Sequence, residues 1–353
     1  MSEASPAKAS VWQRLTARLL TKCYILGLVF VLVGLEWWAE YWLPLWVLLF
    51  APPLLLLAPL AIISPWLLFK RERRLLSLLL LSCFVMMAFY ATYHIHGASK
   101  HGGLTVITHN VGQGNRAAFV HSFPDETPDA VLLQDVNYAG SRSAEYQKRY
   151  PSYANRGVSQ FMLLSPHEIE SAEVVTGAEW RKAPIAARFV IRAAGRHIAL
   201  YSVHLPTPRS SLNRALSPRL ALEIAGLRGA PTDGFASYRE CLDARITLAR
   251  QLAAVLEKET LPFLVGGDFN TPDHGVIYHT FASRLSDAHP AAGHGWGFTF
   301  PGGREGRLSA FIGPWLRLDY WFAGHGWKPV DCQVAPDSNS QHRAVLARFD
   351  PVP

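Results

Sequence analysis

The residues of this chain that are best suited to chemistry stand beside short apolar runs. In "LPFLVGGDFNTPD", residues 261–273, the apolar run 263–265 breaks at two glycines and is followed by Asp268 and Asn270. Other polar residues stand at or beside the end of an apolar run in the same way: Asn110, Asp135, His204, Asp319 and His342. One such residue is typical of a turn, whereas an ordered series of them predicts a shared site.

These side-chain types suit the attack of water on a phosphate group. A hard cation such as Mg²⁺ prefers oxygen ligands and keeps several waters, so one or two carboxylates suffice to hold it. A carboxylate can draw a proton from water, and a His of near-neutral pKa can pass protons while a second carboxylate fixes its tautomer. Such groups together orient an in-line attack and offset the charge that develops on the phosphate oxygens.

The elements that must position these residues follow from hydrophobic periodicity. Five runs are predicted to be strands: 104–110, 130–135, 197–205, 262–270 and 317–323. A sixth strand is predicted within 339–349, where His342 precedes it. Residues 238–259 are predicted to be a helix, whose apolar stripe is Leu242, Ile246, Ala249, Leu252, Ala253 and Leu256. Strands that alternate with helices predict an α/β sheet covered by helices. Sites in such sheets lie at strand ends, so the polar residues are expected to meet at one edge.

The order "HN…LQDV…SVHL…GGDFN…RLDYWF…SQH" resembles the endonuclease/exonuclease/phosphatase superfamily over about residues 104–349. An apolar N-terminal region and "GWGFTFP", residues 295–301, further resemble the membrane-anchored branch that includes teicoplanin-resistance proteins. The fold that this resemblance implies is a four-layered α/β sandwich, in which two packed mixed sheets are flanked by helices. The catalytic domain is then expected over 104–353.

The resemblance also implies roles for individual residues. Asn110, Asp135 and Gln341 match positions near the divalent metal, which is usually Mg²⁺, with Mn²⁺ as the alternative. Asp268 and Asn270 match the pair that positions the attacking water and the phosphate. His204 matches a phosphate contact. Asp319 and His342 match a hydrogen-bonded acid–imidazole pair.

Two residues depart from the family's pattern. Asp135 stands where the family usually has Glu, so the metal must lie nearer or bind more loosely. Gln341 stands where the family usually has Asp in "SDH", and the neutral amide removes a charge from the metal's surroundings. Weaker metal binding is expected, and one hypothesis is therefore a catalytically impaired binding protein.

The N-terminal region is predicted to cross a membrane three times. The spans are expected at about 24–38, 43–69 and 75–93, within a membrane region at 23–95 that follows a cytoplasmic segment at 1–22 and precedes a linker at 96–103. Basic residues before the first span and "KRERR" at 70–74 indicate cytoplasmic loops. The catalytic domain then lies on the extracytoplasmic side of the plasma (inner) membrane. A cleaved signal peptide is the alternative for 24–38, although a small-residue cleavage site is missing.

Two segments bear on the substrate. Residues 206–240 follow the His204 strand and hold several Arg among apolar residues, which indicates either a lid that binds phosphate through Arg209 or Arg214 or an ordinary surface insertion. The Gly-rich stretch 293–303 displays Trp296, Phe298 and Phe300, which suits base stacking, lipid contact or simple packing under a loop.

The first hypothesis is a membrane-anchored, metal-dependent phosphoesterase whose substrate is a lipid phosphate or pyrophosphate at the bilayer. The alternative from the same residues is an extracytoplasmic endonuclease or exonuclease. Lys and Arg exceed Asp and Glu by seven over the whole chain, but most of that excess lies before residue 101. The near-neutral remainder is weak evidence against nucleic acid, and no protein partner is implied.

Overall fold

The computed structural model describes residues 6–352 except 70, 91–92, 97–102, 113–121, 138–142, 194, 217–232, 303–310 and 337–340. The chain divides into two compact units, Met1–Thr92 and Tyr93–Pro353. The predicted membrane region ended at residue 95, whereas the second unit already begins at Tyr93. His94 and Ile95 form strand β1, which pairs with β13 (His294–Gly295) of the same unit.

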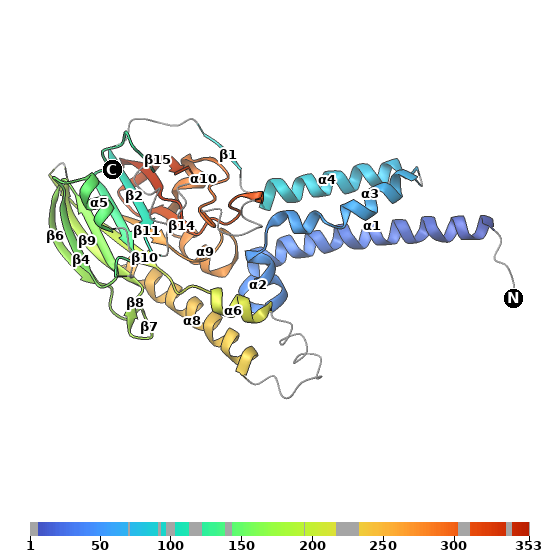
Figure 1. Ribbon diagram of the computed structural model, residues 1–353, viewed down its shortest axis with the longest axis horizontal. Coiled ribbons are helices and arrows are strands. Elements are labelled where there is room, and N and C mark those ends of the chain that lie inside the picture. The colour runs from blue at the N-terminus through green and yellow to red at the C-terminus, as the bar shows by residue number, and fades with distance from the viewer. Residues whose placement is uncertain are drawn as a thin grey trace. The chain divides into compact units, whose positions relative to one another are not determined.

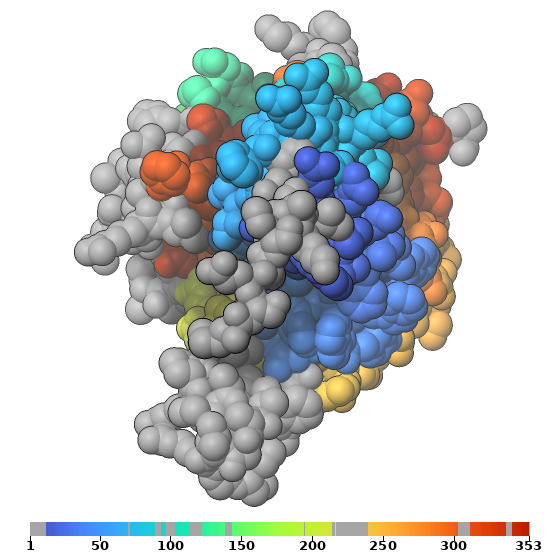
Figure 2. All heavy atoms as spheres, turned by 90° about the vertical axis from the view of Figure 1, so that its right-hand side faces the viewer, coloured from blue at the N-terminus to red at the C-terminus, as the bar shows by residue number. Residues whose placement is uncertain are grey.

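The N-terminal unit is helical. Its elements are α1 (Pro6–Trp37), the 3-10 turn η1 (Ala39–Tyr41), α2 (Leu43–Phe50), the 3-10 turn η2 (Pro53–Leu57), α3 (Leu60–Phe69) and α4 (Arg73–Tyr90). Helices α1, α3 and α4 lie side by side (Figures 1 and 2). They bury a shared cluster that includes Leu28, Leu67 and Leu79, while many other apolar side chains stay exposed, among them Leu26, Ile62 and Phe84.

Within the described residues, one helix is long and apolar enough to cross a membrane, Trp12–Trp37 with 26 residues. It starts earlier than the predicted first span, because apolar residues continue at helical spacing among Arg14, Arg18 and Lys22. Helices α2 and α3 would make a second span only if the pair counts as one, and they are bent by 113° at their break. Helix α4, where the third span was predicted, is not among the described helices that are long and apolar enough to cross a membrane. A three-span region is therefore not confirmed.

The C-terminal unit contains two six-stranded sheets. The first has the order β15 (Trp327–Val334), β16 (Val345–Pro351), β2 (Leu104–Asn110), β3 (Ala130–Gln134), β5 (Phe161–Ser165) and β4 (Ala154–Val158). The second has the order β12 (Ser286–Asp287), β14 (Asp319–Ala323), β11 (Phe263–Asp268), β10 (Arg196–His204), β9 (Ala186–Ala193) and β6 (Glu168–Val174). Both are mixed, because β2 and β3 run parallel, as do β10 and β11, and the other pairs run antiparallel.

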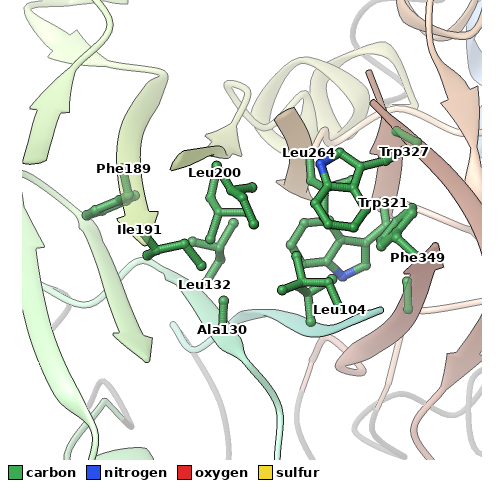
Figure 3. Packing of buried hydrophobic residues seen from close by; sticks show 14 of the residues in the cluster. Leu104, Ala130, Leu132, Phe189, Ile191, Leu200, Leu264, Trp321, Trp327 and Phe349 are labelled. Carbon is green, nitrogen blue, oxygen red and sulfur yellow. The ribbon is translucent and has the colours of Figure 1, made fainter. Parts of the chain in front are cut away.

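The two sheets pack face to face over one apolar core. Figure 3 shows side chains of this core from both sheets, including Leu132 and Phe349 from the first and Leu200 and Trp321 from the second. Each large apolar side chain that is fully buried contributes about 1.5–3 kcal/mol to the free energy of burial. This layer holds the two halves of the unit, and therefore their strand ends, in one position.

Helices cover the outer faces. Helices α8 (Asp233–Leu256) and α9 (Gly275–Ala282) pack on the second sheet, and α5 (Ser143–Arg149) packs on the first. The shorter helices are α6 (Arg209–Ala215) and α10 (Ala288–Ala292), and β7 (Glu179–Trp180) pairs with β8 (Ala183–Pro184) in a small hairpin (Figure 1). Two mixed sheets flanked by helices confirm the predicted four-layered sandwich.

The predicted strands are all present, and the last, predicted within 339–349 after His342, is Val345–Pro351. The predicted helix 238–259 is α8, and its apolar stripe is buried as expected. Strands β4, β5, β6, β9, β12 and β15 of the two sheets were not predicted. The exposed or partly exposed residues of β4 and β6 leave a weak hydrophobic signal, although β4 pairs with its neighbour β5 and β9 with its neighbour β10.

Candidate functional site

The predicted site residues meet at one edge of the sandwich. Each sheet has a parallel pair near its centre, β2–β3 and β10–β11, and the carboxyl ends of parallel strands lie at the same edge. The residues there line one cavity of about 450 Å³. The predicted residues among its lining are Asn110, Asp135, His204, Arg209, Asp268, Asn270, Gln341 and His342.

Asp268 occupies the centre of this edge. It is 1% exposed. Its Oδ2 accepts from Asn110 Nδ2 at 2.9 Å and from Asn270 Nδ2 at 3.1 Å, and its Oδ1 accepts from the Asn270 backbone N–H at 2.8 Å. The Nε2 atoms of His204 and His342 each lie 3.7 Å from Asp268 Oδ2. The carboxylate is therefore held by two amides and placed between two imidazoles.

The glycines before Asp268 allow the close packing that places it there. A Cβ at Gly267, where φ is +149°, would lie 2.0 Å from the carbonyl oxygen of Val203 on β10. After the strand, Asn270 adopts φ +50°, a left-handed conformation that Asn tolerates. Its side chain turns back to Asp268 and also donates to the Leu205 carbonyl at 2.9 Å. One side-chain amide hydrogen of Asn270 thus binds Asp268, and the other anchors the Asn270 side chain to Leu205, the residue after β10.

Asp319 and His342 form the predicted acid–imidazole pair. His342 Nδ1 donates to Asp319 Oδ2 at 2.9 Å, and both residues are buried. Burial opposes the charged imidazole, but the nearby carboxylates of Asp319 and Asp268 outweigh it and raise the pKa of His342 to about 9. Burial also raises the pKa of Asp319, against the effect of His342. His342 therefore carries both ring protons at neutral pH.

His204 is fixed by a residue that the sequence did not indicate. Its Nδ1 donates to Gln160 Oε1 at 2.8 Å, and Gln160 Nε2 donates to the Pro184 carbonyl at 3.0 Å. The ring's Nε2 thus faces Asp268. Gln160 lies in the turn between β4 and β5, far from any motif, and no local pattern distinguishes it from other turn residues.

Asp135 has the side chain most suited to a hard cation. It adopts φ +59° directly after β3, and its carboxyl group lines the cavity. Among the described residues it accepts no hydrogen bond, and its ion-pair contact is with His204 Nδ1 at 3.6 Å. A partly exposed carboxylate that shares the cavity lining with Asn110 and Gln341 is a ligand type that Mg²⁺ and Mn²⁺ prefer.

A second group of possible ligand atoms is more tightly clustered. Atoms of Asp268, Asp319 and His342 lie within 4.8 Å of one another. Several of these atoms are already in hydrogen bonds, because His342 pairs with Asp319 Oδ2 and Asp268 accepts from two amides, whereas the buried Asp319 Oδ1 has no hydrogen-bond partner among the described residues. The structure thus offers two groups of possible ligand atoms, and metal binding beside Asp135 stays a prediction from the sequence.

Gln341 contacts a cation at the edge of the cavity. Arg209 Nη2, at the start of α6, donates to Gln341 Oε1 at 3.0 Å. The same guanidinium lies 6.0 Å from the ring of Phe300, which is 5.1 Å from the ring of His342. Arg209 thus lies beside the catalytic edge, as predicted. The side chain of Arg214 lies outside the described residues, as does much of the predicted lid, 217–232.

The aromatic loop divides between two environments. Phe300 packs against His342 at the site, whereas Trp296 is 43% exposed and stacks on Phe298 at 5.9 Å. Tyr93 meets Trp296 edge to face at 4.8 Å. The loop was expected to serve in base stacking, lipid contact or packing. For Phe300 the structure shows packing, against the ring of His342.

Buried polar residues behind the site complete its support. Gln134 donates to Ser202 Oγ at 2.9 Å and to Thr108 Oγ1 at 3.1 Å, which links the two sheets. Arg245, whose direction the sequence left open, is fully buried on α8 and donates to the Asn270 carbonyl at 2.6 Å. The sequence signal for Gln134 is a polar residue at the end of an apolar strand, and the signal for Arg245 is a charged residue beside the apolar stripe of α8.

Comparisons with known proteins agree with this architecture. The family model described as "Endonuclease/Exonuclease/phosphatase family" matches residues 107–342. No curated protein matches the chain. The resemblance to the teicoplanin-resistance branch is not shown by these comparisons and stays a prediction.

Solved structures with a similar fold share little sequence. An endonuclease/exonuclease/phosphatase from Beutenbergia cavernae is 16% identical with a TM-score of 0.46, covering 70% of this chain and 71% of that one. A mannosyl-6-phosphatase from Bacteroides thetaiotaomicron is 13% identical with a TM-score of 0.49, covering 70% and 99%. Beta toxin from Staphylococcus aureus is 13% identical with a TM-score of 0.47, covering 69% and 99%.

Proposed function

Because this chain belongs to the endonuclease/exonuclease/phosphatase family, we propose that it is a membrane-anchored, divalent-metal-dependent phosphoesterase that hydrolyses a phosphate ester or pyrophosphate of a lipid. The observation that carries this proposal is the position of Asp268 between His204 and His342, each 3.7 Å away, on the wall of a cavity of about 450 Å³.

The chain's own residues account for attack and charge stabilisation. Asp268, oriented by Asn110 and Asn270, accepts a proton from the attacking water. His342, which keeps a proton on Nε2, donates to a phosphate oxygen, and His204 lines the cavity beside Asp268 as a further phosphate contact. A Mg²⁺ or Mn²⁺ ion held by Asp135, with Asn110 and Gln341 beside it, would supply positive charge to the phosphate oxygens.

The substrate and the cellular location are inferred from two features. Helix Trp12–Trp37 is apolar enough to anchor the chain in a membrane, and Arg209 offers a cation at the edge of the cavity. An anchored enzyme encounters lipid phosphates at the bilayer surface. The basic residues near Arg14 and at 70–74 favour the cytoplasm for those segments. With α4 as the third span that the sequence predicts, the catalytic unit is then on the extracytoplasmic side of the plasma membrane.

Phosphate release by the full chain in lipid nanodiscs tests the proposal. With Mg²⁺ or Mn²⁺, wild-type protein should release phosphate from a polyprenyl pyrophosphate or a lipid phosphomonoester, and Asp268→Ala should lower the rate at least 10³-fold. Asp243→Ala, an exposed carboxylate on α8, is the matched control and should keep the wild-type rate. Cleavage of single-stranded DNA alone would replace the lipid with nucleic acid. Metal binding without turnover of any substrate would favour the binding-protein hypothesis.

A further inference from the structure

The cavity at the site is larger than a phosphate group needs. At about 450 Å³ it falls within the range of roughly 300–1,000 Å³ that encloses organic ligands. The polar residues already described form one side of it. The organic group attached to the phosphate must therefore lie against the rest of the wall, and the side chains of that wall indicate its chemistry.

Part of the cavity lining is apolar. It is built by Trp180, Pro184 and Ile185 from the β7–β8 hairpin and the residue after it, together with Leu205 and Pro206 after β10. Trp180 is only partly buried, and one of its faces is covered by the guanidinium of Arg181 at 5.2 Å. An apolar surface on the cavity of a hydrolase excludes water when an apolar group of the substrate covers it.

The hairpin that presents Trp180 is held in an unfavourable conformation. Its two turn residues, Arg181 and Lys182, have φ of +50° and +69°, and such a turn ordinarily uses Asn and Gly. Residues with a Cβ adopt left-handed φ at a cost in free energy, and retained strain of this kind concentrates at binding sites. Figure 1 shows the hairpin extending beyond the second sheet.

The apolar wall is joined to the catalytic side by direct hydrogen bonds. Gln160 accepts from His204 and donates to the Pro184 carbonyl at 3.0 Å. The His204 backbone N–H donates to the Ile185 carbonyl at 2.8 Å. The hairpin therefore has a fixed position relative to the imidazole that faces Asp268, so a group bound on the wall positions the phosphate.

We propose that Trp180, Pro184 and Ile185 form the subsite for an apolar organic group esterified to the scissile phosphate, with Trp180 as the specificity-determining residue. This inference rests on the proposed function for the identity of the reaction, and it adds the place and the chemistry of leaving-group recognition. Affinity at this subsite grows with the apolar area that the ligand buries, and it is independent of the groups that bind the phosphate.

Binding of alkylphosphonates, which contain no scissile ester, tests the subsite without turnover. Calorimetry would compare ethyl-, butyl-, hexyl- and octylphosphonate on the full chain in nanodiscs with Mg²⁺. Wild-type affinity should rise about fourfold for each methylene that reaches the wall. In Trp180→Ala the octyl-to-ethyl ratio of affinities should fall at least tenfold, while ethylphosphonate affinity changes less than about twofold. Trp180→Leu, which keeps an apolar side chain, should give an intermediate ratio.

Trp296→Ala is the matched control, because Trp296 is not among the residues that line the cavity, and it should keep the wild-type ratio. Partitioning of alkyl chains into the nanodisc is the same for every variant, so it cancels in the comparison. Equal ratios in wild type and Trp180→Ala, or no chain-length preference in wild type, would overturn the subsite.

Hydrolysis of the matching alkyl phosphates separates the two proposals, since the leaving-group pKa is nearly constant along the series. Turnover with no chain-length dependence would remove the subsite and leave the proposed function intact. Chain-dependent phosphonate binding without turnover of any phosphate ester would retain the subsite and refute the proposed function.

Discussion

At the scale of single residues, the protonation of His342 decides how the site handles charge. Its Nδ1 donates to Asp319 at 2.9 Å, and its Nε2 lies 3.7 Å from Asp268. Asp319 is not among the residues that line the cavity, so it acts through His342 by fixing the ring and its charge. An imidazole held in this way serves as a hydrogen-bond donor to phosphate at neutral pH rather than as a base.

Replacing Asp319 with Asn should reduce turnover while leaving the site's shape unchanged. The amide still fits beside His342 but no longer stabilises the charged ring, so kcat should fall by about 10²- to 10⁴-fold. Steady-state hydrolysis of the lipid substrate measures this. Asp331→Asn, which changes another buried carboxylate outside the cavity, should keep kcat within a few-fold. An Asp319→Asn rate above a tenth of wild type would refute the role.

The raised pKa of His342 predicts how stability depends on pH. The folded-state value of about 9 exceeds the ordinary 6.5, so the pairing stabilises the fold fully below about pH 6.5 and loses this contribution as pH rises through 9. We compare the free energies of unfolding of wild type and His342→Gln in protein kept metal-free with chelator. The advantage of wild type should shrink by on the order of 1–3 kcal/mol between about pH 6.5 and pH 9. Urea unfolding at several pH values measures the difference, and a constant difference would contradict it.

At the scale of elements, two neighbouring strands and one helix fix the catalytic turn. Strands β10 and β11 run parallel from Ala199 and Phe263 to His204 and Asp268, so these two side chains end at the same level. Beyond the strand, Arg245 on α8 donates to the carbonyl of Asn270. A helix packed on the outer face of the sheet thereby holds the backbone of a residue inside the cavity.

Substitution of Gly267 by Ala should destabilise the C-terminal unit strongly. The added Cβ would lie 2.0 Å from the Val203 carbonyl oxygen at φ +149°, so β10 and β11 must separate, at a cost of about 3 kcal/mol or more. Urea unfolding measures the change. Gly195→Ala is the control, because Gly195 has φ +74° but nothing within 4 Å of its Cβ position. It should cost only about 1 kcal/mol, and equal costs at both positions would contradict the steric explanation.

At the scale of the whole molecule, the site exists only because two sheets are packed face to face. Asn110 and Asp135 come from the first sheet, and His204 and Asp268 come from the second. The polar link from Gln134 to Ser202 crosses between the sheets just behind the cavity. Any ligand that contacts both sets of residues therefore stabilises the packed sandwich relative to the unfolded chain.

Divalent metal should stabilise the C-terminal unit through Asp135. At a free concentration of about 100 times Kd, binding adds about 2.7 kcal/mol to the free energy of unfolding, measurable by urea unfolding in Mg²⁺ against chelator. In Asp135→Asn this difference should shrink to less than 1 kcal/mol, and Asn tolerates the left-handed backbone at that position. Asp243→Asn should keep it. If Asp135→Asn keeps the full stabilisation by metal and Asp268→Asn loses it, the metal binds at Asp268, Asp319 and His342 instead.

Much of the site could be read from the sequence because its signals are local. An apolar run followed by a polar residue defines a strand end without reference to distant contacts, and such ends indicated Asn110, Asp135, His204 and Asp268. Asp319 and His342 were indicated by their positions at or before the start of an apolar run. The apolar stripe of α8 followed in the same way, since helical periodicity is a property of neighbouring residues, whereas the four-layered sandwich was implied by the resemblance to the family. The number of membrane spans did not follow, because apolar composition alone does not decide whether a bent pair of helices crosses a bilayer.

Tertiary structure decided the contacts between residues distant in the chain. Three features depend on how strands and helices pack. They are the hydrogen bonds of Gln160 to His204 and Pro184, the hydrogen bond of Arg245 to Asn270, and the apolar wall around Trp180. No sequence spacing encodes those distances, because each joins elements whose separation is set by the core between the sheets and the helices outside them. The residue types of the site are therefore determined locally, and their geometry is determined by packing.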